Sequence, residues 1–277
     1  MKFIDGGVTA AKGFLASGIH CGIRKNQTKK DLAMIKSETL CAAAAVYTQN
    51  KVYGAPITVT RENLKNGYAQ AVIVNSGNAN TCNSDGVEKA QMMCDIAAES
   101  LGVKADDVIV ASTGVIGMSL DVTPIANAAD ELAAQVSENG GHDAAEAIMT
   151  TDTVSKECAV EVQIDGKTVT LGACCKGSGM IHPNMATMLC FMTTDANITP
   201  EMLQMALSSV VVDTFNMISV DGDTSTNDMV CIMANGKAEN AVIDSENEAF
   251  EIFKAALMEL SVKLSRKIAG DGEGAER

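Results

Sequence analysis

The sequence has little positive charge, and this shortage narrows the range of partners. Its 277 residues include 21 Lys and Arg against 35 Asp and Glu, which gives a formal net charge of −14. Nucleic acids and anionic membranes attract cationic surfaces, so this balance opposes their binding. We therefore expect neither a nucleic-acid partner nor a membrane partner.

Long hydrophobic runs are also missing. A helix that crosses a bilayer needs about 18 or more apolar residues in succession, and no segment has such a run. The first residues, Met1–Ile19, lack the basic start and apolar stretch of a secretion signal. Since 47% of the residues are nonetheless apolar, the chain can bury a large core. We expect a soluble, cytoplasmic protein whose length suggests about two domains.

The nine cysteines form no recognisable metal or redox motif. Only Cys174 and Cys175 are adjacent, and neither a C-x-x-C spacing nor a paired His occurs around them. The cysteines lie in apolar segments and are odd in number. We expect reduced thiols that pack as small hydrophobic side chains, without a disulfide framework.

Patterns of apolar residues in the first half predict a strand, a helix and a strand. Continuous apolar runs at Val72–Asn75 and Val108–Ala111 are typical of buried strands. Between them, Asp85 and Glu88 have the spacing of a capping box, and Gly102 is a stop signal. The apolar face of the intervening helix would consist of Val87, Ala90, Cys94, Ala97 and Leu101.

A second helix and a hairpin are predicted in the middle of the chain. Thr123 followed by Pro124 is a typical helix start. The residues that this helix would bury are Ile125, Ala129, Leu132 and Val136. Apolar residues alternate through Val160–Ile164 and resume at Val169 after Asp165-Gly166, which predicts a β-hairpin with a two-residue turn.

The last third of the chain continues the mixture of strands and helices. Strands are predicted at Met188–Met192 and Val230–Ala234, with a helix from Thr199 to Val212 between them. Ser245 and Glu248 have capping-box spacing before a final helix. Its buried face would consist of Ala249, Ile252, Ala256, Leu260 and Leu264. The fold class is therefore α/β, with mixed sheets and packed helices.

The segment Lys176–Leu189, with the sequence KGSGMIHPNMATML, has the features of a self-cleavage site. Its glycines permit positive φ and Pro183 restricts the backbone, so the peptide bond before Thr187 can be held in an unusual geometry. A Thr hydroxyl that attacks the preceding carbonyl would turn the Ala186–Thr187 amide into an ester, which water hydrolyses. The new α-amine, with a reference pKa of about 7.7–8, could then activate the Thr187 hydroxyl. Spacing alone favours the simpler interpretation, in which the glycines form a loop and Thr187 begins a strand.

This segment is similar to the cleavage segment of the ornithine acetyltransferase (glutamate N-acetyltransferase, ArgJ) family, in which the Thr becomes the N-terminal nucleophile. Four further segments resemble family blocks in the family's order: Gly13–Ala33, Val74–Asn80, Ser112–Gly117 and Ser219–Asp228. The resemblance implies a self-processing N-terminal-nucleophile enzyme of the ornithine acetyltransferase type. Residues 1–186 would form its α chain and residues 187–277 its β chain.

The resemblance also implies the roles of individual residues. The catalytic residues would be Thr187, the nucleophile, with Thr113 and Gly114 as the oxyanion hole. The substrate-binding residues would be Thr150, Lys176, Thr187 and Glu273. A lysine can pair with the carboxylate of an amino acid and a glutamate with its ammonium group. Without the resemblance, these residues would be interpreted as a strand-ending turn and solvated surface positions.

The implied reaction is a ping-pong transfer of acetyl from N-acetylornithine to glutamate in the cyclic pathway of arginine biosynthesis. Acetyl-CoA is a further donor in the bifunctional members of the family, and the sequence leaves its use here open. The paired α and β chains would form a heterotetramer. No cofactor or metal is expected: Asp221, Asp223, Ser225 and Asn227 resemble the start of a calcium loop, but Thr226 and Ile232 replace the Gly and Glu that it requires.

The sequence departs from the family at its C-terminal end. Family members continue beyond the Gly270–Ala275 block and include an Asn and a Thr that contact substrate, whereas this sequence has Glu276-Arg277 in place of the usual Thr-Lys. We therefore expect a C-terminally truncated member. Two other interpretations stay open: an inactive fragment retained as a binding module, or a related self-processing amidase or aminopeptidase, in which the nucleophile is usually Ser.

Overall fold

The strands that the structure describes form one sheet. The computed structural model describes residues 1–180 and 188–274, and this part of the chain contains a nine-stranded sheet with the order β1-β6-β7-β8-β9-β3-β4-β5, in which β2 also pairs with β3. The strands are β1 (Lys2–Ile4), β2 (Phe14–Ile19), β3 (Leu32–Tyr47), β4 (Tyr68–Asn78), β5 (Val108–Val115), β6 (Lys156–Ile164), β7 (Lys167–Lys176), β8 (Leu189–Thr194) and β9 (Met229–Ala234). Length alone suggested two domains, but a single sheet joins all the described regions.

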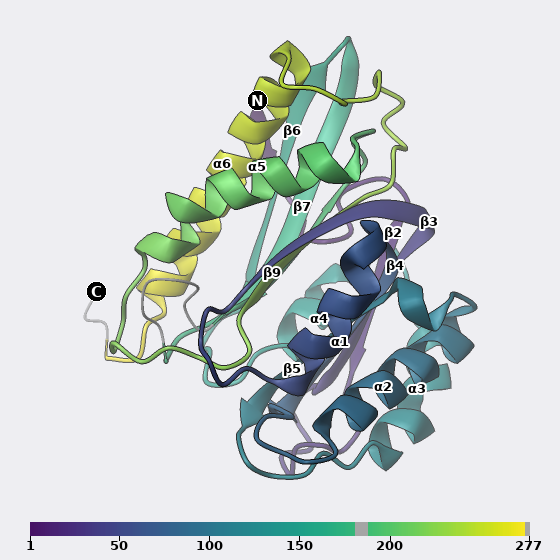
Figure 1. Ribbon diagram of the computed structural model, residues 1–277, viewed down its shortest axis with the longest axis vertical. Helices are drawn as coiled ribbons and strands as arrows, with labels where there is room; N and C mark the ends of the chain where they lie inside the picture. The colour runs from purple at the N-terminus through teal and green to yellow at the C-terminus, as the bar shows by residue number, and fades with distance from the viewer. Residues whose placement is uncertain (181–187, 275–277) are drawn as a thin grey trace.

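Six α-helices in the same part of the chain cover this sheet (Figure 1). They are α1 (Ala55–Asn63), α2 (Gly86–Leu101), α3 (Thr123–Ala134), α4 (Gly141–Ala147), α5 (Pro200–Val212) and α6 (Glu248–Gly270). The helices α5 and α6 lie together over one part of the sheet, and α2 and α3 lie side by side at the opposite end of the molecule. None of the helices in residues 1–180 and 188–274 is long and apolar enough to span a bilayer.

The sheet is mixed, as the sequence predicts. The strands β4 and β5 are parallel and are joined through α2, which confirms the predicted strand–helix–strand unit. A second parallel pair, β8 and β9, is joined through α5. The other named pairs are antiparallel. In the order of strands, β8 and β9 lie in the middle of the sheet, with β7 on one side and β3 on the other.

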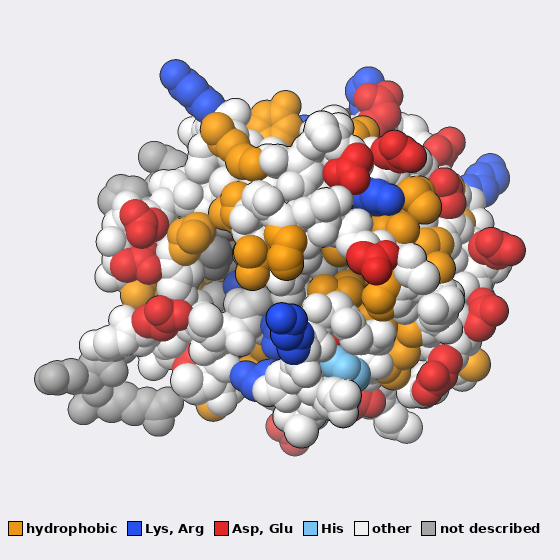
Figure 2. Space-filling view, turned by 90° about the horizontal axis from the view of Figure 1, so that it is seen from below, with side chains coloured by type: hydrophobic (Ala, Val, Ile, Leu, Met, Phe, Trp, Pro, Cys, Tyr) orange, Lys and Arg blue, Asp and Glu red, His pale blue; other side chains and the backbone are white. Residues whose placement is uncertain are grey.

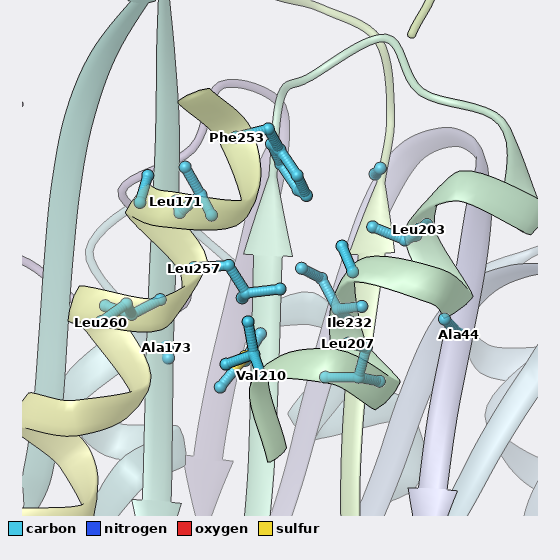
Figure 3. Close-up of a cluster of buried hydrophobic side chains, with 14 of the residues drawn as sticks. Ala44, Leu171, Ala173, Leu203, Leu207, Val210, Ile232, Phe253, Leu257 and Leu260 are labelled. Carbon is cyan, nitrogen blue, oxygen red and sulfur yellow. The ribbon is translucent and has the colours of Figure 1, made fainter. Parts of the chain in front are cut away.

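The largest core lies between the sheet and the helices α5 and α6. Figure 3 shows Leu203, Leu207 and Val210 of α5 and Phe253 of α6 pointing toward strand residues such as Ile232. These side chains are almost completely buried. At about 25 cal/mol for each Å² of apolar surface removed from water, each contributes on the order of 2 kcal/mol to the free energy of folding. This packing fixes the direction of α6, whose C-terminal end leads to the candidate site.

Two further cores complete the packing. One joins α2 and α3 to β4 and β5, and includes Met93, Leu132 and Ile73. The other contains α4 and the opposite face of the central strands, with Phe14 and Phe191. Together they hold the ends of β4 and β5 in a fixed position.

The predicted hairpin and one predicted cap are confirmed in detail. Ile164 pairs with Lys167, so Asp165-Gly166 is the two-residue turn between β6 and β7. Both turn residues have positive φ, 51° and 73°, as a type I′ turn requires. Thr199 caps α5, since its side chain accepts a hydrogen bond from the Met202 N–H.

Other predicted caps and buried positions are wrong. The final helix is capped by Asn247, whose side chain accepts a hydrogen bond from Phe250 N–H, and not by Ser245. Asp85 occupies the N-cap position of α2, but its side chain accepts no hydrogen bond from the first turn of the helix. Its carboxylate accepts a hydrogen bond from the Ser119 hydroxyl instead. Thr123 is the first residue of α3 and not its cap. Of the positions predicted to be buried, Val87 is exposed, while Val136, Ala249 and Ile252 are only partly buried.

Candidate active site

A cavity of about 820 Å³ opens where the ends of β4, β5 and β7 meet the segment after α6. Figure 2 shows a hollow on this face of the molecule, with atoms of Lys or Arg at its base and hydrophobic side chains beside it. The predicted site residues that the structure describes all line this cavity: Thr113, Gly114, Thr150, Lys176 and Glu273. Residues up to 160 positions apart in the sequence are therefore neighbours in space.

The predicted oxyanion pair lies at the end of β5. Thr113 is buried, and Gly114 has a φ of +133°, a conformation that side chains disfavour. A Cβ atom on Gly114 would lie 2.3 Å from the carbonyl carbon of Gly77, its partner on β4. Only a glycine permits this close approach of two backbones. The packing of β4 on β5 therefore sets the position of Thr113 and Gly114 at the cavity wall.

Asn227, one of the four residues that resemble the start of a calcium loop, connects the strand ends beside the cavity. Its amide nitrogen donates to the carbonyl oxygens of Ala79 at 2.6 Å and Ser112 at 3.0 Å, while its oxygen accepts from the Thr81 hydroxyl at 2.6 Å. Asn227 thus ties the segment before β9 to the ends of β4 and β5. Among the described residues, no group of three or more His, Cys, Asp or Glu could hold a metal ion.

The cavity contains groups of opposite charge that suit a zwitterionic ligand. Lys176, the last residue of β7, is buried, and this burial lowers the pKa of its ammonium group, although Asp152 and Asp228 oppose the shift. Glu273 is exposed, and its N–H donates to the carbonyl oxygen of Ser178 at 2.7 Å. An ammonium group and a carboxylate on one cavity wall can bind the carboxylate and the amine of an amino acid.

Three charged residues that the sequence analysis did not single out lie behind this wall: Asp152, Lys156 and Asp271 are buried and joined by ion pairs. Burial alone would raise the pKa of Asp152, but Lys176 and Lys156 lower it below its ordinary value. A signal for two of them existed, since Asp152 and Asp271 each stand two residues from a predicted ligand. Their burial, however, depends on contacts between distant segments.

The predicted nucleophile Thr187 and the cleavage residue Ala186 lie outside the described residues, 1–180 and 188–274. The residues on either side are placed. Met180 lines the cavity, and Met188 is buried and donates its N–H to Oδ1 of Asp228 at 2.9 Å. Asp228 therefore holds the residue that directly follows the predicted nucleophile.

Asp228 is a buried carboxyl with an unusual acidity. Burial raises its pKa from 3.8 to about 8, although the hydrogen bond from the Met188 N–H opposes this rise. The folded protein therefore keeps a proton on Asp228 at a pH where the unfolded chain has released it. The stability that this carboxyl contributes is complete below pH 3.8 and declines as the pH rises toward 8.

We expect Asp228→Asn to remove this decline, because an amide has no proton to lose in this range. Between pH 4 and pH 8, the free energy of unfolding of the original protein should fall relative to that of the variant by at least about 1.4 kcal/mol, the equivalent of one pKa unit. Urea unfolding at both pH values measures the difference. A constant difference between the two proteins across this range would show that Asp228 titrates normally.

Comparison with known proteins gives the family of the chain. The sequence profile of the ArgJ family matches residues 15–277. The chain is 47% identical to the arginine biosynthesis bifunctional protein ArgJ of Caldanaerobacter subterraneus subsp. tengcongensis, with all of this chain and 68% of that protein covered. It is 50% identical to the protein of the same name from Bacillus subtilis, with 99% and 67% covered. The chain belongs to the ArgJ family. This confirms the family inferred from the sequence. It also confirms the expected type of enzyme, an acyltransferase of arginine biosynthesis.

Solved structures agree with this assignment. The crystal structure of the arginine biosynthesis bifunctional protein ArgJ from Bacillus halodurans has a TM-score of 0.63 at 45% identity, with 67% of this chain and 97% of that chain covered. The ornithine acetyltransferase of Mycobacterium tuberculosis, solved with ornithine, has a TM-score of 0.61 at 34% identity, with 66% and 97% covered.

The fold is shared more widely than the ArgJ family. The L-aminopeptidase D-Ala-esterase/amidase of Ochrobactrum anthropi, described as a new variant among the Ntn hydrolase fold, has a TM-score of 0.58 over 99% of this chain at 14% identity. This likeness concerns the fold alone. The predicted fold class, α/β with a mixed sheet and packed helices, is confirmed, and the fold is similar to that variant of the Ntn hydrolase fold.

Proposed function

We propose that this ArgJ family chain transfers the acetyl group of N-acetylornithine to glutamate through an acetyl ester on Thr187. The observation that carries the proposal is the common cavity of Thr113, Gly114, Thr150, Lys176 and Glu273. These residues come from four separate segments of the chain, and the family resemblance assigns all of them to one site. The names of the relatives, which act in arginine biosynthesis, support the same reaction.

The first step is self-cleavage between Ala186 and Thr187. The Thr187 hydroxyl attacks the Ala186 carbonyl, the peptide nitrogen leaves, and water hydrolyses the resulting ester to give a carboxylate and a free α-amine on Thr187. Two solved relatives support a cut at this place, because their chains are 97% covered while they match only 66–67% of this chain. That share of 277 residues is about 186, the length of the proposed α chain.

In the transfer itself, the α-amine of Thr187 takes the hydroxyl proton while the oxygen attacks the acetyl carbonyl. Negative charge then develops on the carbonyl oxygen, and the Thr113 hydroxyl and the Gly114 N–H supply two donors at the cavity wall. The protonated amine returns the proton to the departing nitrogen of ornithine. Glutamate repeats the sequence in reverse: its amine attacks the ester, and Thr187 is released.

Substrate recognition follows from the charges of the cavity. Lys176 would pair with the carboxylate that N-acetylornithine and glutamate share, and Glu273 with the free ammonium group of ornithine. Thr150 can donate to or accept from either group. One site then serves both half-reactions, as a ping-pong mechanism requires.

Two finer features belong to the same proposal. The relatives are called bifunctional, which supports acetyl-CoA as a second acetyl donor, with no other cofactor. The α and β chains would remain associated and assemble as a heterotetramer. An acetyl-CoA assay without N-acetylornithine, and the mass of the native assembly, test these two features separately.

The acetyl-enzyme is the expected product when glutamate is omitted. Brief incubation with N-acetylornithine alone should add one acetyl group to the peptide that begins with Thr187, because the ester has no acceptor other than water. Peptide mass spectrometry after acid quenching detects the ester, and steady-state rates against both substrates should give parallel double-reciprocal lines. Intersecting lines would contradict the covalent mechanism and favour direct transfer between two bound substrates.

A further inference from the structure

A buried lysine behind the cavity wall connects the three segments that carry the proposed substrate ligands. Lys156 begins β6 and is completely buried. Its ammonium group donates to Asp152 Oδ1 at 2.7 Å, to Asp271 Oδ2 at 2.6 Å and to the Val154 carbonyl oxygen at 3.3 Å. Three protons thus have three acceptors, which is the condition for keeping an ammonium group away from water.

Asp152 carries this connection to two of the ligands. Its Oδ2 accepts the N–H of Thr150 at 3.0 Å, and its Oδ1 accepts the N–H of Gly177, the residue after Lys176, at 2.7 Å. One carboxylate therefore fixes the backbone at Thr150 and directly beside Lys176, two cavity-lining residues that lie 26 positions apart in the sequence.

Asp271 carries the connection to the third ligand. It follows the last residue of α6, and both its oxygens accept hydrogen bonds from Thr153, one from the N–H at 3.1 Å and one from the hydroxyl. Glu273 stands two residues later, and its N–H donates to Ser178. The end of α6 is thereby attached to the turn that carries Thr150 and to the segment after Lys176.

Charge balance explains why the connection needs a lysine. Asp152 lies beside both Lys156 and Lys176, so two buried cations share this carboxylate, and Asp271 supplies the second negative charge. Without Lys156, Asp271 would lose its buried cation, and Lys176 would be the main partner of Asp152. Lys176, the proposed partner of the substrate's carboxylate, would then be drawn toward Asp152 and away from the cavity.

We propose that Lys156, through Asp152 and Asp271, is the positioning residue that sets Glu273 against Lys176 and Thr150 for recognition of an amino-acid substrate. The substrate part of this inference rests on the proposed function. The anchoring part rests only on the hydrogen bonds and can be measured in the absence of any substrate.

The anchoring is tested first, by hydrogen exchange of the unligated protein. In Lys156→Met, which keeps the length of the side chain and removes its charge, exchange at the amides of Gly177 and Glu273 should accelerate about tenfold or more, the effect of losing one hydrogen bond to a charged group. Amides in the middle of α6 should stay protected. Unchanged exchange at Glu273 would overturn the inference, whatever the activity.

The substrate part is tested by kinetics of acetyl transfer. Lys156→Met should raise the KM for N-acetylornithine about tenfold, with a smaller change in kcat. The matched control is Asn63→Ala. The side chain of Asn63 is also buried and donates a hydrogen bond to the Val108 carbonyl oxygen, but Asn63 does not line the cavity. A variant that is only less stable should contain less active enzyme, which lowers the apparent kcat and leaves the KM unchanged.

Two milder variants keep the test decisive if Lys156→Met fails to fold. Asp271→Asn keeps the shape of the side chain and removes its charge, and Thr153→Val removes one hydroxyl donor to it; both should raise the KM in the same direction. Faster exchange with an unchanged KM would overturn the role in recognition. Faster exchange in a chain whose original form transfers no acetyl group would refute the proposed function and leave the anchor standing.

Discussion

Thr187→Ala should yield a single uncut chain of 277 residues that has lost almost all acetyl transfer. The substitution removes the hydroxyl that attacks the Ala186 carbonyl, and with it the oxygen that would carry the acetyl group. Self-cleavage and transfer are therefore lost together, and the residual transfer should fall by more than about 10³-fold, as for other lost nucleophiles. Intact-mass measurement of the purified protein distinguishes one chain from the two pieces, residues 1–186 and 187–277.

Thr187→Ser is the matched control for this experiment. It keeps a hydroxyl at the same position, so the chain should still be cut and should retain part of its activity. Undiminished cutting of Thr187→Ala would place the nucleophile elsewhere. An uncut original protein that nevertheless transfers acetyl would separate the two reactions and remove the free α-amine from the mechanism.

Thr113→Ala should lower the rate of acetylation of the enzyme by about 10²-fold, the usual loss for one oxyanion donor. Thr113 is buried at the end of β5, where the close contact of Gly114 with Gly77 fixes the backbone. Because the methyl group of alanine keeps the packing of the Cβ atom, the loss should fall on the rate and much less on stability. Rapid-quench measurement of acetyl-peptide formation gives this rate directly.

Thr113→Ser separates the hydroxyl from the methyl group of the side chain. It retains the donor and should restore most of the rate. Equal rates for the alanine variant and the original protein would remove Thr113 from the proposed oxyanion hole, while equal losses for serine and alanine would show that packing, and not the donor, is responsible.

Local sequence patterns were sufficient to predict an element when the residues that end it and the residues that form its buried face lie within one short stretch of the chain. The hairpin around Asp165-Gly166 is an example, because the turn residues and the alternation of apolar residues act over a few positions. The strand β3 was not predicted, since polar residues interrupt the apolar run of this 16-residue strand. Its first half pairs with β2 and its second half with β9, while β4 pairs with residues of both halves across a shift in register. Only the completed sheet stabilises such a strand.

The candidate site shows the same division. Ligands such as Lys176 and Glu273 were predicted because short motifs carried the family resemblance, and the structure places them in one cavity. Lys156 was not predicted, because a lysine at the start of an apolar strand has no local sign of burial. Its position follows from Asp271, which lies 115 residues away and becomes its neighbour only when α6 packs on the sheet.

The central place of β8 and β9 has a consequence for the order of events during maturation. Both strands follow the proposed cut, yet they lie between β7 and β3, which precede it. The intact precursor can insert them during a unimolecular folding reaction, whereas two separate pieces would first have to find each other in solution. The cut would therefore turn folding into a one-time event: a protein denatured after it must reassemble from two molecules, at a rate that depends on concentration.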